Sequence, residues 1–358
     1  MHLSPLKINA KVETMSKLLS NGDTLLFADI RQMIEDTRKT VSQTVNMGMT
    51  LLYWNIGRRI NEDVLQNDRA EYGKRIVVTL SRQLTEEYGS GFSKSSLSRM
   101  CAFHQEFPML EIVATLSQQL TWSHFIEIIP LKEALQREFY SQMCRIEKWD
   151  VRTLRKKIQS MLFERTAISQ KPEELAKMEL RALKEEDQLS PDLVFQNPYL
   201  LDFLGLKDTF LEKDLEQAIL HKLEQFLLEL GRGFAFMERQ KRMVIDGNDH
   251  KLDLLFYHRK LKRLIAIDLK IGKFEAEYKG KMELYLRYLE KHETEPSEDA
   301  PIGLILCAEG NHEQIELLQL DKGNVKVAEY ITEYLPPELL KRKLHQFVAA
   351  SRRQIGGR

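Results

Sequence analysis

The chain has 358 residues, of which 43% are hydrophobic and 30% are charged, enough to bury the cores of two ordinary domains. Its 53 lysines and arginines balance its 53 aspartates and glutamates, which excludes a uniformly basic nucleic-acid binder and leaves only local basic patches. Three widely separated cysteines exclude a disulfide framework, and no apolar run is long enough for a membrane span, so we expect a cytoplasmic protein without a membrane partner.

The first half of the chain is predicted to be mainly helical. Residues 1–24 lack the continuous apolar core of a secretory signal and are expected to form a loose leader or a short helix. Residues 25–165 show helical periodicity and are expected to form a first domain. The first apolar face of that domain is expected to lie in its core and comprises Phe27, Ile30, Met33 and Ile34.

Two neighbouring helices predict a helix-turn-helix. The first contains VVTLSRQLTEEY, a break follows at Gly89-Ser90-Gly91, and Ser93 is expected to cap the second helix, SKSSLSRMCAFHQEF. In that second helix Leu97, Met100 and Phe103 are expected to pack inward.

The outward face of the second helix carries small hydroxyls and cations. Lys94, Ser95 and Arg99 suit contacts with DNA phosphates and base edges. Helix pairs with glycine turns also occur in ordinary helical bundles, so the pattern leaves both interpretations open. A second basic cluster within residues 152–157 covers more than one helical face, which fits a solvated surface as well as a phosphate track.

Composition changes after the first domain. Residues 166–190 contain few large apolar side chains and many charges, which predicts a charged helical linker; with the irregular segment that follows, the linker is expected to span residues 166–200. Residues 201–358 are expected to form a second domain that opens with a helix from Lys213 to Gly231. Glu216 lies beside the apolar stripe of that helix. It could belong to a functional site, or it could be an ordinary exposed glutamate in the first turn of the helix, where the helix dipole favours an acid.

The second domain contains a predicted three-stranded meander. Its strands are expected at residues 239–245, 251–257 and 261–268. The first turn is Asp246-Gly247-Asn248, whose residues tolerate a left-handed backbone, and the second centres on residues 259–260. Two further strands are expected at residues 302–307, in the centre of a sheet, and at residues 325–329, at its edge.

The register of the second hairpin brings charged residues together. If its turn centres on residues 259–260, Asp253 lies opposite Ala266 and diagonal to Asp268. Because side chains alternate between the two faces of a strand, Asp253, Asp268 and Lys270 are expected on one face. Two carboxylates, together with water and a substrate phosphate, form the oxygen shell that Mg²⁺ prefers.

Chance is the alternative explanation for this pattern. An acid two residues before a lysine arises easily in so charged a chain, and Glu277-Tyr278-Lys279 is a second example. Asp268 differs because it follows the apolar run 264–267, where stability alone gives little reason for a carboxylate. A second acid at the hairpin offset and a third on the preceding helix add to that context.

With these residues in place, the stretch from Leu201 to Gln319 resembles the PD-(D/E)XK nuclease superfamily, and within it the YhcG-like bacterial branch. The likeness is carried by DLEQAILHKLEQFLLELG, LDLLFYHR, IAIDLKIGKFEAEYKGKMELYLRYL and APIGLILCAEG. The N-terminal part resembles the separate helical domain of that family. The resemblance implies an α+β protein: a mainly helical, helix-turn-helix or winged-helix-like domain, followed by a restriction-endonuclease-like αβββαβ domain.

The resemblance also implies roles for individual residues. It places Glu216 where an acid leans toward the metal, and it places Lys281 and Tyr285 on a helix that flanks the substrate. Members of the family often carry glutamine at the position of Lys281, which leaves its specific role open, although a lysine can still meet phosphate. Gln240, one strand over, is a weaker candidate for holding substrate or water.

These observations predict a nuclease that uses Mg²⁺ or Mn²⁺ to hydrolyse nucleic acid, with DNA as the expected partner. Asp253 and Asp268 would hold one or two ions, helped by the Leu269 carbonyl and by Glu216. Lys270 would stay protonated beside two carboxylates, position the attacking water and stabilise the pentacoordinate phosphate. A homodimer is expected because many nucleases of this fold act as dimers.

Two other classes of function remain as alternatives. The chain could be a catalytically silent DNA-binding protein on a nuclease fold, although loss of one of the three charged residues would be the mark of such a protein. It could also be an oligomeric scaffold whose helical domain mainly builds an assembly. Metal-independent DNA binding, or self-association without nucleic-acid affinity, would distinguish these alternatives from the enzyme.

Overall fold

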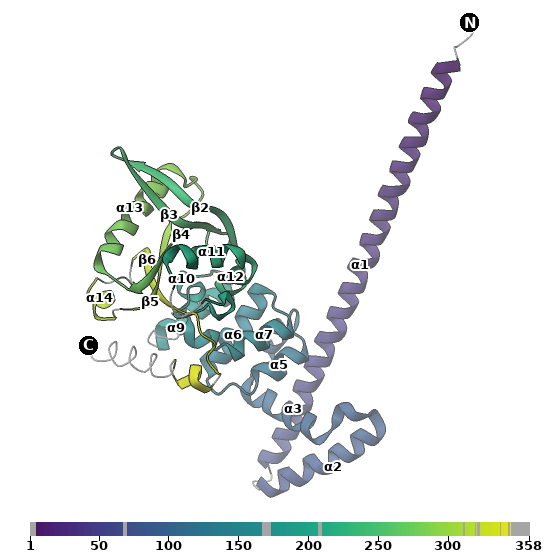
Figure 1. The fold of residues 1–358 in the computed structure, drawn as a ribbon. Helices are drawn as coiled ribbons and strands as arrows, with labels where there is room; N and C mark the ends of the chain where they lie inside the picture. Colours follow the sequence, from purple (N-terminus) through teal and green to yellow (C-terminus); the bar gives the residue numbers. More distant parts are fainter. Residues whose placement is uncertain are drawn as a thin grey trace. The chain divides into compact units, whose positions relative to one another are not determined.

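The computed structural model describes residues 5–66, 70–166, 173–206, 210–310, 312–318, 320, 323–336, 338–342 and 344 (Figure 1). The chain divides into two compact units, Met1–Leu131 and Lys132–Arg358. By packing, the helices between residues 132 and 165 belong to the second unit, whereas the sequence prediction counts them with the first; the expected domain limits stay predictions. Within the described ranges, no helix combines the length and the apolar composition that a membrane crossing requires.

The first unit is helical and is organised around one long helix. Its elements are α1 (Pro5–Gln66), α2 (Ala70–Tyr88), the 3₁₀ helix η1 (Ser90–Phe92), α3 (Lys94–Glu106), α4 (Leu110–Ser117) and α5 (Trp122–Ile128). Gly57 lets α3 cross α1 closely, since a Cβ there would lie 1.8 Å from the Met100 carbonyl oxygen. The Trp54 indole N–H donates to the Phe107 carbonyl at 2.7 Å, which fixes the end of α3 against α1.

The expected core face at the start of α1 is wrong. Phe27 and Met33 are 68% and 66% exposed, and residues 26–46 are exposed throughout. Trp54 and Ile60, further along the same helix, are buried. Periodicity shows that a helix has an apolar face, but it does not show whether another element of the unit covers that face.

The expected helix pair around the glycine turn is present. Ser93 caps α3, and its side chain accepts a hydrogen bond from the Ser96 N–H at 3.4 Å. Leu97, Met100 and Phe103 are fully buried, as expected. The opposite face of α3, with its hydroxyls and cations, is exposed. Contact with DNA by this face stays a prediction.

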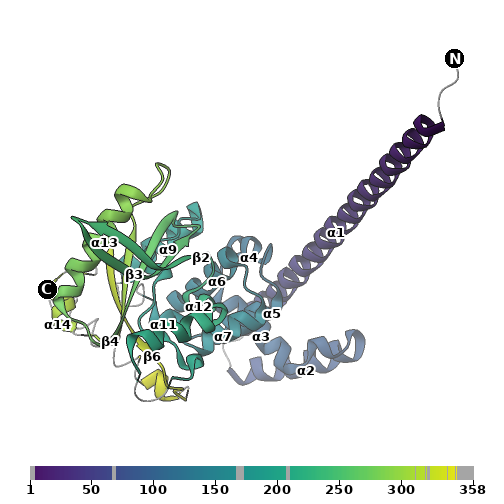
Figure 2. The ribbon, with the colours of Figure 1, turned by 45° about the horizontal axis from the view of Figure 1, so that its top comes forward.

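The second unit contains a mixed six-stranded sheet (Figure 2). Its strands are β1 (Tyr199–Leu200), β2 (Phe234–Ile245), β3 (Asn248–His258), β4 (Arg263–Lys273), β5 (Ile302–Glu309) and β6 (Val325–Ile331), in the order β1-β6-β5-β4-β3-β2. The pairs β2–β3 and β3–β4 are antiparallel, whereas β4–β5, β5–β6 and β6–β1 are parallel. The strand β5 is central, as expected. The strand β6 is not at the edge, because β1 pairs with it.

Helices cover both faces of this sheet. The helical elements of the unit are α6 (Ala134–Glu147), α7 (Val151–Gln159), α8 (Leu162–Arg165), α9 (Glu173–Glu186), α10 (Pro191–Val194), the 3₁₀ helix η3 (Asp202–Leu204), α11 (Glu212–His221), α12 (Leu223–Leu230), α13 (Ala276–His292) and α14 (His312–Leu317). One core packs α11 and α12 on the sheet, and a second core packs α13 on the opposite face. The helix expected from Lys213 to Gly231 is broken at Lys222 into α11 and α12.

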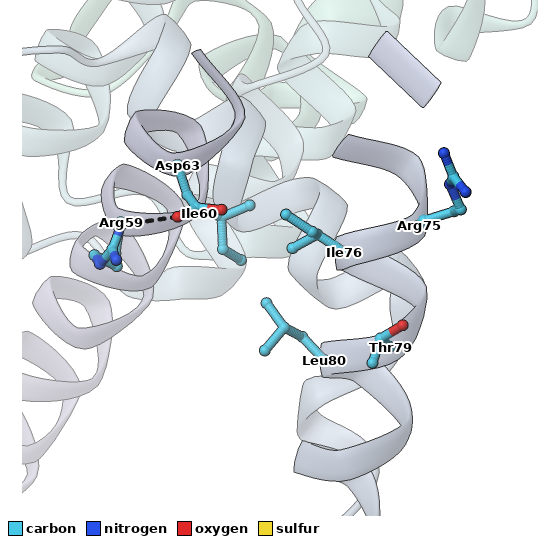
Figure 3. A pocket seen from close by; sticks show the side chains of 7 residues that line it. All are labelled: Arg59, Ile60, Asp63, Arg75, Ile76, Thr79 and Leu80. Atoms are coloured by element: carbon cyan, nitrogen blue, oxygen red, sulfur yellow. Dashed lines mark ion pairs between the residues drawn. The ribbon is translucent and has the colours of Figure 1, made fainter. Parts of the chain in front are cut away.

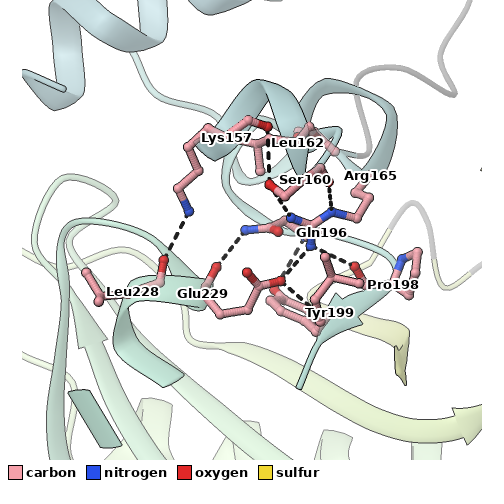
Figure 4. A network of polar contacts seen from close by, with 11 residues as sticks. Lys157, Ser160, Leu162, Arg165, Gln196, Pro198, Tyr199, Leu228 and Glu229 are labelled. Atoms are coloured by element: carbon pink, nitrogen blue, oxygen red, sulfur yellow. Dashed lines mark hydrogen bonds and ion pairs between the residues drawn. The ribbon is translucent and has the colours of Figure 1, made fainter. Parts of the chain in front are cut away.

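Helices α7 and α8 are joined to the sheet domain by a buried polar network, which we call the junction (Figure 4). Arg165 is fully buried and donates to the Ser160 carbonyl, the Pro198 carbonyl and the Glu229 carboxylate. The Lys157 ammonium, from the expected basic cluster, donates to a carbonyl near the end of α12 at 3.0 Å. Lys157 therefore makes a structural contact, and a role of the basic cluster in phosphate binding stays a prediction.

The expected charged linker is only partly free of contacts. Its helix α9 buries Ala176, Leu180 and Leu183. Arg145 of α6 donates to the Leu183 carbonyl at 2.7 Å and pairs with Asp187 at 2.6 Å. Sparse but regularly spaced apolar residues were therefore sufficient to dock α9, because they lie on one helical face.

Candidate active site

The site lies where strands β3 and β4 separate, and their register differs from the expectation. Leu255, not Asp253, pairs with Ala266. The turn comprises residues 259–262, in which Lys262 has a positive φ of 49°, and the Leu261 N–H donates to His258 Nδ1 at 3.1 Å. The longer turn shifts the pairing by two residues, and a shift of two keeps every side chain on its expected face.

Asp253 occupies the point of separation. The last regular pair is Leu254 with Ile267, and beyond it the Asp253 Oδ2 atom accepts a hydrogen bond from the Leu269 N–H at 2.8 Å. The carboxylate thus takes the place of a strand carbonyl. This contact fixes Asp253 beside the segment that carries Asp268 and Lys270.

Asp268 and Lys270 are charged side chains inside the sheet domain, 2% and 7% exposed. The Lys270 ammonium lies 2.8 Å from Asp268 Oδ2 and donates to the Leu269 carbonyl at 2.9 Å. Burial alone would lower the pKa of Lys270, but attraction to Asp268, with a smaller part from Glu212, outweighs it and raises that pKa. Lys270 therefore stays protonated, as the sequence predicts.

The second carboxylate has the opposite tendency. Burial, together with repulsion by Asp268, raises the pKa of Asp253 to about 6, although the hydrogen bond from Leu269 opposes the shift. The structure thus holds two neighbouring carboxylates at a cost that a bound cation would relieve. We call Asp253, Asp268 and Lys270 the β3–β4 cluster.

Gln240 connects this cluster to α11. Its side-chain amide donates to Glu216 Oε2 at 2.8 Å and to Asp253 Oδ1 at 3.3 Å. The left-handed φ of 48° at Gln240 interrupts the regular course of β2. Glu216 lies in the second turn of α11 rather than the first, because the helix starts at Glu212.

Helix α13 brings Lys281 and Tyr285 to the other side of the cluster. The Lys281 ammonium lies 3.5 Å from Asp268 Oδ1 and 5.4 Å from the centre of the Tyr285 ring. Tyr285 is 1% exposed, and its hydroxyl donates to the Lys251 carbonyl at 3.2 Å. Tyr285 therefore supports Lys281 from inside the fold, and a stacking contact with nucleic acid would require it to move.

Three residues that contact Lys270 were not found from the sequence. Glu212 Oε2 lies 3.7 Å from the ammonium, and the ring of Tyr278 is centred 5.4 Å from it. The Tyr330 hydroxyl donates to the Lys270 carbonyl at 3.0 Å. Glu212 lies one helical turn before Glu216, a spacing that could have suggested it; nothing in the sequence links the two tyrosines to Lys270.

The cluster fits a hard divalent cation by its donor chemistry. Asp253, Asp268 and the Leu269 carbonyl offer only oxygen atoms, which Mg²⁺ and Mn²⁺ prefer. Among the described residues, no three His, Cys, Asp or Glu side chains already converge on one point in the manner of a metal centre. The Lys270 ammonium occupies two of these oxygen donors, and the Gln240 amide contacts a third.

The first unit contains a different kind of hollow, a cavity of about 620 Å³ between α1 and α2. Ile60, Ile76 and Leu80 point toward one another across it, and Arg59 pairs with Asp63 at its side (Figure 3). The described lining offers no pair of carboxylates with a lysine. The expected nucleic-acid contacts Lys94, Ser95 and Arg99 lie elsewhere in this unit, exposed on α3.

Comparisons with known proteins identify related families for both halves of the chain. The family model described as the DUF1016 N-terminal domain matches residues 29–165, and the YhcG PDDEXK nuclease domain matches residues 192–345. The chain is 33% identical over 357 residues to "Putative nuclease YhcG" of Escherichia coli (strain K12), covering 91% of this chain and 94% of that protein.

Solved structures give a more limited likeness. A repair endonuclease from Pyrococcus abyssi is 19% identical with a TM-score of 0.25, and the match covers 37% of this chain and 50% of that one. EndoMS in its apo form is 15% identical with a TM-score of 0.24, covering 36% and 49%. This chain thus spans about half the length of each of these structures.

Proposed function

Since the chain belongs to the family of YhcG-like PDDEXK nucleases with a DUF1016 N-terminal domain, we propose that it hydrolyses DNA phosphodiester bonds with Mg²⁺ or Mn²⁺. The observation that carries this proposal is the β3–β4 cluster itself. Two neighbouring carboxylates and a buried, protonated lysine meet where two strands separate, and a stable fold does not require that combination.

Each residue of the cluster has a role in this proposal. Asp253, Asp268 and the Leu269 carbonyl would hold the ion, which supplies Lewis acidity and lowers the pKa of a bound water. Lys270 donates hydrogen bonds to the phosphate oxygens and offsets the charge that develops on them. Because Lys270 keeps its proton, it does not act as the general base.

Gln240 and Glu216 support the acids in this scheme. The Gln240 amide holds Asp253 and Glu216 together, so Glu216 contributes through that hydrogen bond or through water at the ion. Lys281 attracts a substrate phosphate from the side of α13, where its side chain is 42% exposed.

The experiment that tests this function is cleavage of labelled DNA and RNA substrates with Mg²⁺ or Mn²⁺. The native chain is compared with Asp268→Ala and Lys270→Ala at matched purity and thermal stability. We expect cleavage of DNA that both substitutions abolish while DNA binding survives. Binding without cleavage of any substrate by the native chain would favour the silent DNA-binding alternative.

We propose that the exposed face of α3 binds DNA outside the active site. Lys94 and Arg99 are exposed, and the hydroxyl-rich start of the helix suits phosphate contacts. Replacing both cations by alanine should weaken binding to all DNA sequences and lower the salt slope of the binding constant by about 2. Replacing Arg75 and Arg82, which are both exposed on α2, by alanine is the control that removes the same charge.

We propose that the apolar stripe of α1 pairs with α1 of a second copy. Four apolar residues of this stripe are exposed: Phe27, Ile30, Ile34 and Val41. They are separated by three, four and seven residues, which is the spacing of apolar residues in helices that pair as a coiled coil. The occupant is a second copy because its α1 supplies the same period. Ile34→Glu should lower the mass by light scattering from dimer to monomer, whereas Leu175→Glu on α9 should not. A monomeric native chain would contradict this proposal.

A further inference from the structure

The Lys270 ammonium and a divalent cation would compete for the same atoms. The ammonium lies 2.8 Å from Asp268 Oδ2 and 2.9 Å from the Leu269 carbonyl oxygen. Both atoms belong to the oxygen set that would hold the ion, and an ion bound to them would lie within a few ångströms of the ammonium and repel it. A shift of the Lys270 side chain away from these atoms would remove that repulsion.

The backbone of Lys270 is fixed, so the movement is restricted to its side chain. The Tyr330 hydroxyl donates to the Lys270 carbonyl at 3.0 Å, and the residue is paired with Cys307 of β5 in the sheet. A lysine side chain has four rotatable bonds, so its ammonium can move by a few ångströms while the strand stays in register.

A carboxylate and an aromatic ring on the other side of the ammonium offer it a second set of partners. From the Lys270 ammonium, Glu212 Oε2 is 3.7 Å away and the centre of the Tyr278 ring is 5.4 Å away. At these distances the carboxylate and the ring both attract the ammonium. Glu212 is about half exposed, so a position of the ammonium beside these groups would lie toward solvent relative to the buried Asp268. We call it the outer position of Lys270.

Glu216, the acid one turn later on α11, does not serve this purpose. Its carboxylate is engaged by the Gln240 amide at 2.8 Å. Among the described residues, Glu212 forms an ion pair only with Lys270. The two acids of α11 thus have separate partners, one on the side of Asp253 and one on the side of Lys270.

We propose that Glu212 is a positioning residue that draws the Lys270 ammonium to the outer position, vacating the oxygen atoms of Asp268 and Leu269 for a divalent cation. This inference rests on the proposed function and adds the order of events in the site. Without Glu212, Lys270 remains a built-in competitor of the metal ion.

A double-mutant cycle on Mn²⁺ affinity tests the proposal without relying on cleavage. Mn²⁺ binding to the full chain is measured by calorimetry for the native protein, Glu212→Gln, Lys270→Met and the double variant. We expect Glu212→Gln to weaken binding about fivefold to tenfold and Lys270→Met to strengthen it, because no ammonium then has to leave. In the Lys270→Met background, Glu212→Gln should change the affinity by less than about twofold.

Controls separate positioning from the general effect of one negative charge. Glu277→Gln removes an exposed acid from the first turn of α13 and should leave Mn²⁺ affinity within about twofold of native. Glu212→Asp keeps the carboxylate and should restore part of the lost affinity. Thermal melting of each variant verifies that the fold persists.

Two results would overturn the inference, and they have different meanings. If Glu212→Gln weakens Mn²⁺ binding equally with Lys270 and with Met at that position, Glu212 acts through its charge alone; the positioning role is then wrong and the proposed nuclease function stands. If the native chain binds neither Mn²⁺ nor Mg²⁺, the positioning role and the metal-dependent function are both wrong.

Discussion

Arg165 and Lys270 are buried cations of the second unit with contrasting surroundings. At the junction, the Arg165 guanidinium donates to two carbonyls and to Glu229, whose carboxylate also accepts from the Leu200 N–H at 2.8 Å. In the β3–β4 cluster, Lys270 holds oxygen atoms that another cation could use, beside a second acid with a raised pKa. Both regions bury charge. They differ in whether the oxygen atoms around the cation still have capacity for another cation.

This difference separates structure from chemistry. A buried ion pair whose hydrogen bonds are all made has no capacity left for a ligand, and breaking it costs stability. A cluster with surplus negative charge is less stable than its geometry could allow and can bind a cation. The junction is therefore expected to control folding, and the cluster is expected to control ligand binding and turnover.

The largest effect is expected from removing one acid of the cluster. Asp268→Asn should lower metal-dependent cleavage by about 10³-fold or more, since the ion loses a charged ligand. The unfolding free energy should fall by less than about 3 kcal/mol, because Lys270 keeps the Leu269 carbonyl and Glu212 as partners and the repulsion between Asp268 and Asp253 is relieved. Single-turnover cleavage and urea denaturation measure the two quantities. A large loss of stability with little loss of cleavage would reverse the comparison.

The junction should show the opposite pattern. Arg165→Met leaves Glu229 without its cation in a largely buried site and should cost about 3–5 kcal/mol of unfolding free energy. Cleavage per folded molecule should remain close to native. The matched control is Arg181→Met, which removes an exposed pair with Glu185 and should cost about 0.5 kcal/mol or less. Denaturant titration at fixed pH distinguishes them.

His258, the last residue of β3, predicts a pH dependence of stability. Burial lowers the pKa of His258 from 6.5 to about 4, and its ring also lies near Lys260. Between those values the unfolded chain binds a proton that the folded chain does not, so the contribution of His258 to stability falls as pH falls. Asp253, whose pKa is raised to about 6, contributes in the opposite direction below that pH. The loss should approach about 1.4 kcal/mol per pH unit and about 3 kcal/mol in total. Because Asp253 titrates in both proteins, the test is the difference in unfolding free energy between the native chain and His258→Gln, measured by denaturation from pH 7 to pH 4. That difference should change by the amount above, in the direction that disfavours the native chain at low pH; a difference that does not depend on pH would contradict the assignment.

The smallest effect is expected at the exposed rim of the cluster. Lys281 pairs with Asp268 at 3.5 Å, and its side chain is 42% exposed. A contact between a partly exposed lysine and a substrate phosphate contributes about 1 kcal/mol or less. Lys281→Gln should therefore raise KM for DNA by about fivefold with little change in kcat. The effect should shrink at high salt. A loss in kcat as large as that of Asp268→Asn would place Lys281 inside the catalytic group.

The face on which the charged residues meet was predicted correctly from the sequence, whereas the predicted register of β3 and β4 was wrong. The turn is longer than expected and shifts the β3–β4 pairing by two residues. Asp253 and Asp268 still project to one face, because side chains repeat with a period of two along a strand. Predictions based on that period survive an error in turn length; the predicted opposition of Asp253 and Ala266 does not.

Helical patterns were less informative about burial. The first apolar face of α1 has the same periodicity as its buried continuation, yet Phe27 is exposed and Trp54 is buried. In the second unit, the stripe expected as one helix is divided at Lys222, so Leu215 and Phe226 reach the same core from two helices. The period fixes the orientation of side chains on one helix, whereas contact depends on which other elements pack there.

The sequence by itself determined the local elements: strands of alternating pattern, a glycine turn between two helices, and the acid and lysine at the end of an apolar strand. These follow from interactions between residues close together in the chain. Only the tertiary structure decided that Gln240 joins Asp253 to Glu216 and that Glu212 and Tyr278 lie beside Lys270. Those contacts join residues on different helices and strands, and their distances are set by how α11 and α13 pack on the sheet.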